Sequence, residues 1–366
     1  MKKHLVLAGA GHAHMVTMAN IRMIRDLGHQ VTVIGPSDYH YYSGMGPGML
    51  GSGYDPDDIR FAVRDTVEGQ GGTFLRDAIA GLDPVTREVH LESGKSVVYD
   101  VLSCNTGSHV NVPQILGRRE NIYTVKPIER LYQARTEIEA LGQKQSVTVA
   151  VVGGGPAGTE VAGNVAQLLG RVRYPARVIL FAGRGLLSRF PRAVRAKSRS
   201  ILVKSKVDIR EDGHLLSIED NHLHFDSGSD EYADFIILAT GVHPSPFFRE
   251  AGLSTGPDGG LLVNKYLQNP EYPEIFGGGD CIYYRDRPLD KVGVYAVREN
   301  PVLFHNLKAF LEGEPLEEFD PGGDYLLIFN LGNGQGVLRK KWFQISGKIA
   351  FRIKDWIDRK FMAQFQ

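Results

Sequence analysis

Two glycine-rich turns are the features of this sequence best suited to chemistry with phosphate groups. Gly9-Ala10-Gly11 follows an apolar run, and Gly153-Gly154-Gly155 follows a run rich in valine. In such a turn the first glycine permits the tight bend and the second lets backbone N–H groups approach a phosphate, while the N-terminus of the next helix adds partial positive charge. We therefore expect each turn to bind the pyrophosphate of a dinucleotide, through Gly9, Gly11, Gly153 and Gly155.

The two turns differ in completeness. Gly158 completes the pattern Gly-x-Gly-x-x-Gly in the second turn, whereas His14 stands in place of the third glycine in the first. Taken alone, the first turn fits an ordinary tight turn equally well. Because a second copy follows one domain length later, we interpret the pair as two dinucleotide-binding units.

The elements that must position these turns are predicted from the hydrophobic pattern. Strands are expected at 5–8, 31–34, 147–152 and 178–181, and helices at 12–27, 129–141 and 157–169. Each glycine-rich turn thus lies between a strand and a helix, as in a βαβ unit. At 366 residues the chain is long enough for two or three domains.

Both units lack the acidic residue that usually ends the second strand and binds ribose hydroxyls. Gly35 and Ala182 occupy that position. Ser37 or Asp38 could substitute in the first unit. In the second, Arg184 could attract a 2′-phosphate or could be a solvated surface arginine, so we expect only a weak preference between NADH and NADPH.

Three other strand ends carry glycines. Thr106-Gly107 and Thr240-Gly241 each follow an apolar run, and Gly279-Asp280 closes a third. The Asp280 carboxylate could accept hydrogen bonds from the ribityl hydroxyls of a flavin, or could cap a turn. We expect these strand ends to contribute to the cofactor sites through Thr106, Gly107, Gly241, Gly279 and Asp280, together with Ser37 after the strand at 31–34.

As an ordered set, these motifs resemble the pyridine nucleotide–disulfide oxidoreductase superfamily over residues 1 to about 310. The resemblance implies an α/β fold with two Rossmann-like domains. An FAD-binding domain at 1–115 and 242–320 would be interrupted by an NAD(P)H-binding domain at 116–241, and a C-terminal α/β segment would occupy 321–366. Gly9, Gly11 and Asp280 would then hold FAD, and Gly153, Gly155 and Gly158 would hold the nicotinamide cofactor.

The redox cysteine pair of that superfamily is absent. The two cysteines, Cys104 and Cys281, lie inside the strand-end motifs and are interpreted as small buried residues. The chain therefore resembles the cysteine-free members, chiefly type II NADH dehydrogenases, and the flavoprotein domain fused to selenide, water dikinase. Sulfide:quinone oxidoreductases are also related, but most of them rely on cysteines that are absent here. The stretch 291–300 does not reproduce the quinone-site glutamine motif of type II NADH dehydrogenases.

The resemblance implies hydride transfer from NAD(P)H to FAD and then electron transfer to a quinone-type acceptor. Glu160, on the helix after the second glycine-rich turn, is the candidate catalytic carboxylate for the protons that a quinone requires; the alternative is that it pairs with a ribose or a surface cation. Two other hypotheses stay open: a sulfide or selenium-compound oxidoreductase, and a non-enzymatic flavoprotein redox sensor. No metal site is expected.

Composition restricts the partners. Lys+Arg and Asp+Glu are both 42, and this balance argues against a nucleic-acid-binding protein. The sequence shows no signal peptide and no apolar run of 18 residues, so a cytoplasmic protein is expected.

The C-terminal segment combines aromatic and basic residues. Apolar side chains recur there at helical spacing among many Lys and Arg residues, at Trp342, Ile345, Ile349, Ile353, Trp356 and Ile357. One helix face of this kind suits the surface of an anionic membrane. The alternatives are that the helix packs on the flavin domain or forms a homodimer interface.

Overall fold

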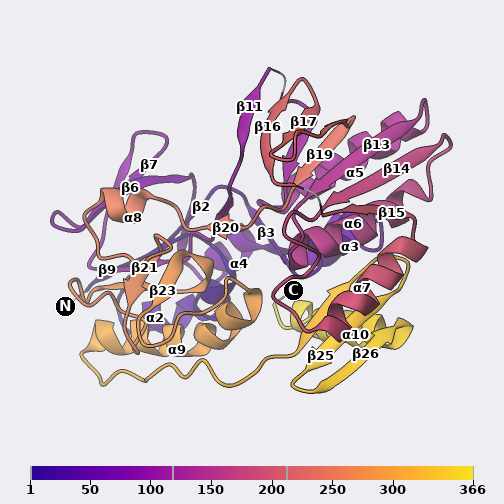
Figure 1. The fold of residues 1–366 in the computed structure, drawn as a ribbon. Coiled ribbons are helices and arrows are strands. Elements are labelled where there is room, and N and C mark those ends of the chain that lie inside the picture. The colour runs from indigo at the N-terminus through magenta and orange to yellow at the C-terminus, as the bar shows by residue number, and fades with distance from the viewer. Residues whose placement is uncertain (1, 118, 212, 366) are drawn as a thin grey trace.

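The computed structural model describes residues 2–117, 119–211 and 213–365. Met1 and Gln366, the outermost residues of the expected domains, lie outside these ranges. The chain forms two five-stranded parallel sheets that lie side by side, with helices packed on them (Figure 1). Both are α/β sheets of the kind that the motifs predicted.

The first sheet has the order β22-β9-β1-β2-β5, and all its strands are parallel. Its central strands are rich in Leu, Val and Ile and are buried on both faces, as helix-covered parallel strands require. The strands are β1 (His4–Ala8), β2 (Gln30–Gly35), β5 (Thr73–Arg76), β9 (Val101–Cys104) and β22 (Ile275–Gly277).

The second sheet repeats this plan with the order β12-β19-β13-β14-β15. All of its strands come from residues 122–210 and 235–238, and from this we propose that 116–241 forms a separate domain. The strands are β12 (Ile122–Thr124), β13 (Val147–Val152), β14 (Ala176–Phe181), β15 (Val207–Arg210) and β19 (Phe235–Leu238).

The helices after the two glycine-rich turns differ. In the second unit α6 (Pro156–Leu169) is continuous, as predicted. The single helix expected at 12–27 is wrong: the segment is divided into η1 (His12–His14), α1 (Met15–Ala19) and α2 (Ile21–Asp26). The break lies at Asn20, whose side-chain amide donates to the Val16 carbonyl. Such a local hydrogen bond competes with the backbone hydrogen bonds of the helix and so favours a break here.

The other helices pack on or beside the sheets. They are α3 (Gly46–Leu50), η2 (Pro56–Ile59), α4 (Val63–Gly69), α5 (Glu129–Gly142), α7 (Arg192–Lys204), α8 (Phe247–Glu250), η3 (Gly279–Cys281) and α9 (Gly293–Glu312).

Smaller sheets complete the two halves. β10 (His109–Val110) pairs with β20 (Val242–His243). β11 (Gln114–Leu116) pairs with β16 (Leu215–Glu219), and it begins two residues before residue 116, where the second domain was expected to begin. The remaining short strands are β3 (Tyr39–Tyr41), β4 (Arg60–Ala62), β6 (Ile79–Asp83), β7 (Glu88–Leu91), β8 (Ser96–Val98), β17 (His222–Phe225), β18 (Asp230–Tyr232), β21 (Leu261–Val263) and β23 (Ile282–Tyr284).

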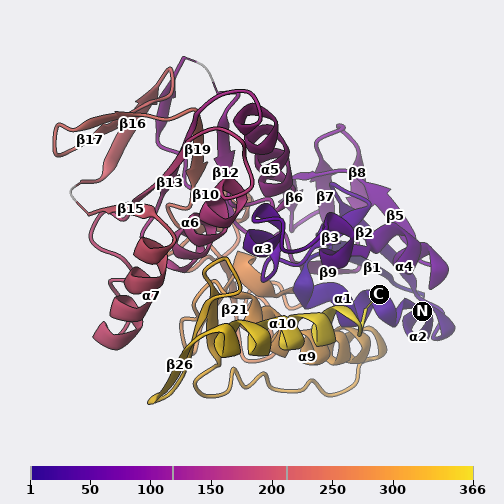
Figure 2. The same cartoon turned by 90° about the vertical axis from the view of Figure 1, so that its right-hand side faces the viewer.

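The C-terminal segment is a three-stranded antiparallel sheet followed by one helix. The sheet consists of β24 (Leu327–Asn330), β25 (Gly336–Lys340) and β26 (Phe343–Gly347), and the helix is α10 (Lys348–Met362). Figure 2 shows α10, in yellow, running from β26 toward α1. No described helix has the length and apolar character needed to cross a membrane.

The expectation of one helix face from Trp342 to Ile357 is therefore only half correct. Trp342 and Ile345 lie before the helix, in the hairpin, because Gly347 has φ +95° and ends the strand immediately before α10. Within the helix, the face turned toward the protein carries Ala350, Lys354, Asp358 and Met362, whereas Ile349 and Trp356 are exposed.

Candidate functional site

One large cavity lies along the carboxyl ends of the two sheets. Its volume of about 1870 Å³ exceeds the roughly 300–1,000 Å³ of a site for one drug-sized ligand. Eleven of the twelve predicted site residues line it, in both halves of the chain: Gly9, Gly11, Ser37, Thr106, Gly107, Gly153, Gly155, Glu160, Gly241, Gly279 and Asp280.

The first glycine-rich turn packs against Asn105, which is not among the site residues predicted from the sequence. A Cβ atom on Gly9 would lie 2.3 Å from the Asn105 carbonyl oxygen, and one on Gly11 would lie 2.1 Å from its Oδ1. Asn105 Nδ2 also donates to the Gly278 carbonyl at 2.6 Å. Because Asn105 Oδ1 also accepts from the Ala13 N–H at 3.3 Å, this one amide side chain joins the first turn to the Gly-Asp motif. A side chain at position 9 would collide with the Asn105 backbone, and one at position 11 with the Asn105 amide.

Gly158 is the one predicted residue that does not line the cavity. A Cβ atom there would lie 1.9 Å from the Gly153 carbonyl oxygen, which is backbone and cannot yield. Gly158 therefore permits close packing of α6 on the turn after β13. This matches the role of the third glycine in dinucleotide-binding turns.

The two candidates for the first ribose site have different surroundings. Ser37 lines the cavity. The Asp38 carboxylate instead accepts from Arg64 Nε at 2.8 Å and from Arg76 at 3.2 Å. Because Asp38 is engaged in these ion pairs, Ser37 is the better candidate to bind the ribose hydroxyls.

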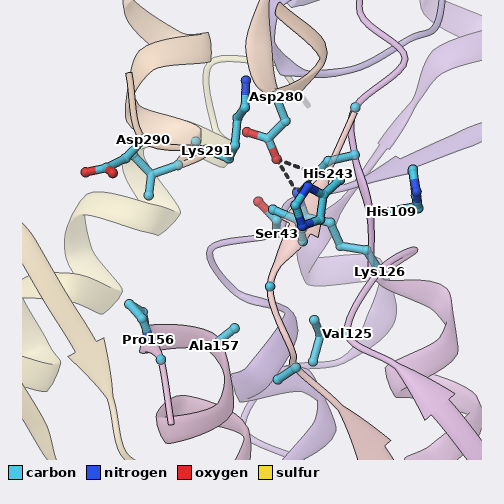
Figure 3. Close-up of a pocket in the computed structure, with 18 of the residues that line it drawn as sticks. Ser43, His109, Val125, Lys126, Pro156, Ala157, His243, Asp280, Asp290 and Lys291 are labelled. Atoms are coloured by element: carbon cyan, nitrogen blue, oxygen red, sulfur yellow. Dashed lines mark hydrogen bonds and ion pairs between the residues drawn. The ribbon is translucent and has the colours of Figure 1, made fainter. Parts of the chain in front are cut away.

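Asp280 lies on the cavity wall beside a lysine from the other half of the chain (Figure 3). Its carboxylate accepts hydrogen bonds from Lys126 and, at 2.8 Å, from the Ser108 hydroxyl. Burial alone would raise the pKa of Asp280, but Lys126 and the two hydrogen bonds outweigh it and hold this pKa below its usual value. Asp280 is thus a fixed anion at neutral pH.

Glu160 lies on the cavity wall, next to a group of charged side chains that do not line the cavity. Its Oε1 accepts from the Asn330 backbone N–H at 2.7 Å. Burial raises the pKa of Glu160 to about 7, although the Lys354 ammonium and the Asn330 bond lower it in part. The carboxyl can therefore both hold and release a proton near neutral pH.

Lys354 lies on α10 and connects Asp358 to the loop before α3. Its Nζ donates to the Gly44 carbonyl at 2.8 Å and to Asp358 Oδ2 at 2.7 Å, and the Tyr42 hydroxyl donates to Asp358 Oδ1 at 3.2 Å. Burial would lower the pKa of Lys354, but Asp358 and Glu160 raise it on balance, so Lys354 stays charged. No sequence motif identified Lys354 or Asp358.

Two histidines meet where the first turn faces the C-terminal helix. His12 Nδ1 lies 2.8 Å from His40 Nε2, and Phe361 of α10 stacks on the His12 ring with centroids 6.0 Å apart. Burial, together with His40 and Lys126, holds the pKa of His12 well below its usual value. Its other nitrogen, Nε2, is buried without a partner among the described residues. His12 is therefore neutral, and a bound molecule can satisfy this nitrogen.

Comparison with known proteins identifies the family. The sequence profile of the pyridine nucleotide-disulphide oxidoreductases matches residues 3–303, which is most of the chain. This chain belongs to that family. It is an FAD-dependent oxidoreductase that uses NAD(P)H, as the sequence predicted.

Individual relatives agree with this assignment. The chain is 27% identical over 282 residues to ferroptosis suppressor protein 1 of Taeniopygia guttata, covering 73% of this chain and 71% of that protein. It is 22% identical over 391 residues to a type II NADH:quinone oxidoreductase of Staphylococcus saprophyticus, covering 98% and 95%. Its fold is similar to that of the sulfide:quinone oxidoreductase of Aquifex aeolicus, with a TM-score of 0.80 at 18% identity over 99% and 91% of the two chains.

The residues of this oxidoreductase fit both cofactors. No side chain caps the N-terminus of α6, and a Cβ atom on its N-cap residue Gly155 would meet nothing within 4 Å, so backbone N–H groups there are open to a pyrophosphate. On the other side, the glycine turn, Asp280 and the unpartnered His12 nitrogen offer the polar groups that FAD requires. We propose that Gly9, Gly11, Ser37, Thr106, Gly107, Gly279 and Asp280 would hold FAD, and that Gly153, Gly155 and Gly241 would hold the nicotinamide cofactor.

The two cysteines of this oxidoreductase lie side by side in the core. Cys281 Sγ lies 3.3 Å from both the Cys104 and Gly278 carbonyl oxygens. Burial raises the pKa of Cys281 to about 11 and that of Cys104 well above its usual value. Neither thiol forms the thiolate that redox chemistry needs at neutral pH.

Replacing Cys104 and Cys281 together by alanine is expected to leave NAD(P)H-driven dye reduction within about twofold of wild type, because neither thiol is a nucleophile. The measurement is steady-state dye reduction per bound FAD, which corrects for any loss of folded protein. A folded variant that retains FAD but loses turnover would show that the cysteines take part in the chemistry.

Proposed function

We propose that this oxidoreductase transfers electrons from NAD(P)H through FAD to a quinone-type acceptor. When bound, the flavin accepts a hydride and passes the electrons on. The observation that carries the proposal is Glu160, a carboxyl with a pKa raised to about 7 on the cavity wall. A quinone takes up two protons with its two electrons, and Glu160 is placed to hold one of them.

The surrounding residues fit this role. Asn330 N–H and the charged Lys354 stabilise the ionised form of Glu160 and so favour release of its proton, whereas burial favours recovery of a proton afterwards. The fixed anion Asp280 and its partner Lys126 also line the cavity, where they would contribute binding and orientation. The similar Staphylococcus saprophyticus protein is itself a type II NADH:quinone oxidoreductase, which supports the same acceptor here.

Anaerobic titration tests the proposal. Adding NADH or NADPH to the purified yellow protein should bleach the flavin band near about 450 nm, and a soluble short-chain quinone should then restore it. Bleaching by sulfide but not by NADH or NADPH would favour the sulfide alternative. Failure of all three reductants would favour a non-enzymatic flavoprotein.

We also propose that the C-terminal segment contacts a membrane that contains the acceptor. Trp342 is 91% exposed, Trp356 64% and Ile349 61%, while Phe343 is 47% exposed. The same segment carries exposed basic residues: Lys340, Lys341, Lys348, Arg352, Arg359 and Lys360. Large apolar side chains left in water beside Lys and Arg suit the interface of an anionic bilayer.

Liposome flotation checks this contact. The protein is expected to float with anionic vesicles at low salt and to be released by high salt, because each basic residue near an anionic surface contributes about 1 kcal/mol that salt screens. The double variant Trp342→Ala/Trp356→Ala should float less, whereas Leu216→Ala, an exposed residue of β16, should not differ from wild type. Protein that stays at the bottom with anionic lipid would contradict the proposal, and a dimer lost in the double variant would indicate a homodimer interface instead.

A further inference from the structure

The turn after β14 presents an arginine to the cavity at the place where an acid normally binds the ribose of NAD. Ala182 directly follows the strand, and the Gly185 N–H donates back to the Ala182 carbonyl at 2.9 Å. Gly183 and Gly185 have φ values of +51° and +117°, so the chain bends sharply on both sides of Arg184. This turn holds Arg184 exposed at the cavity wall.

Arg184 and Arg189 differ from three other arginines near this sheet edge in having no ion pair with a described residue. Arg177, Arg199 and Arg210 form ion pairs with carboxylates of strands β15 and β18 or of residue 211. Arg184 and Arg189 both line the cavity, and neither has a hydrogen bond or ion pair with any described residue. Two positive charges thus face the cavity without compensation.

The two nearby described carboxylates, Asp226 and Glu211, are already occupied. Asp226 does not line the cavity, and its Oδ1 accepts from the His214 N–H at 2.7 Å. Glu211 Oε1 accepts from the Leu186 N–H at 2.6 Å, and its other oxygen pairs with Arg199. Glu211 does not line the cavity. The exposed His214 ring instead lies over Gly183, with Nδ1 3.1 Å from where a Cβ atom would stand. The described wall here carries arginines and an imidazole.

We propose that this wall binds the 2′-phosphate of NADPH through Arg184 and Arg189, and that the protein prefers NADPH to NADH, in place of the weak preference expected from the sequence. The inference rests on the proposed function, since it names the coenzyme of the same site. The guanidinium group matches a phosphate with paired N–H donors and stays charged at all relevant pH values. The buried Ala182 removes the carboxylate that would repel the phosphate and bind the 2′-hydroxyl of NADH.

Binding of a redox-inactive probe tests the site independently of turnover. Calorimetry with the FAD-loaded protein is expected to show adenosine 2′,5′-bisphosphate binding about 10- to 100-fold more tightly than adenosine 5′-monophosphate, the range for one or two charge-assisted hydrogen bonds. Arg184→Ala and Arg189→Ala should each remove much of this difference. Arg192→Ala, an exposed arginine at the start of α7 that does not line the cavity, should leave it unchanged.

Kinetics complete the test. The ratio of kcat/KM for NADPH over NADH should exceed one in wild type, fall in Arg184→Ala, and fall below one in Ala182→Asp, which restores the acid. Equal binding of the two adenosine nucleotides, with no effect of either arginine, would overturn the inference. Tight binding of the 2′-phosphate without oxidation of NADPH would uphold this site and reject the proposed function instead.

Discussion

Replacing Glu160 by glutamine is expected to slow quinone-dependent reoxidation of the flavin by about 100-fold or more, the usual contribution of a positioned proton donor. Reduction of the flavin by NAD(P)H should change little, because hydride transfer depends on positioning rather than on this carboxyl. Stopped-flow absorbance separates the two half-reactions. The matched control is Glu129→Gln, a cavity carboxyl that is not part of the Lys354 group.

The pH dependence follows from the raised pKa of Glu160, about 7. The proton donor is the neutral form, so the reoxidation rate should be constant below this pH and fall as pH rises through it. The Lys354 ammonium lowers the pKa of Glu160; Lys354→Met should therefore move the fall to higher pH. A wild-type profile that is flat from pH 5 to about 9, or one unchanged in Glu160→Gln, would contradict the assignment.

The second large effect is expected at the first glycine-rich turn. Wild type should purify yellow with about one non-covalent FAD per chain, and Gly9→Ala should purify nearly colourless. The added Cβ atom would lie 2.3 Å from the Asn105 carbonyl oxygen, so either the turn or the Gly-Asp motif that Asn105 holds must move. Absorbance of the purified protein and thermal unfolding with added FAD measure the loss.

Gly28→Ala is the matched control for backbone strain. Gly28 has φ +93°, close to the +95° of Gly9, but a Cβ atom there would meet nothing within 4 Å. Both variants incur the roughly 1 kcal/mol or more of a left-handed non-glycine residue, and only Gly9→Ala adds the collision. If both variants retain FAD equally, the collision with Asn105 does not decide binding.

Local motifs allowed much of the fold to be predicted. A glycine turn between a strand and a helix involves neighbours in sequence, so Gly9, Gly11, Gly153 and Gly155 could be found from spacing alone. Each was placed on the cavity wall. The break at Asn20 was missed because helical periodicity continues across it.

The partners that complete the site could not be predicted. Lys126 reaches Asp280 across 154 positions, and Lys354 reaches Gly44 across 310. No spacing rule links such residues, since the pairing arises only when the two halves of the chain meet. At the C-terminus the same spacing of apolar residues fitted both one continuous helix and a hairpin followed by a helix. The pairing of β25 with β26 and the positive φ at Gly347 show that the second arrangement is formed.

The interrupted first sheet has a consequence for synthesis. β9 ends at residue 104, but its outer neighbour β22 begins only at residue 275, after the whole second sheet. Every strand of the second sheet is therefore synthesised before β22, the last strand of the first sheet. The second sheet can be completed first, although most strands of the first sheet precede it in the sequence. Until β22 is made, the fully buried apolar strand β9 remains an open edge, and such edges pair readily with other chains. Protection of the nascent chain matters most while residues 105–274 are being made.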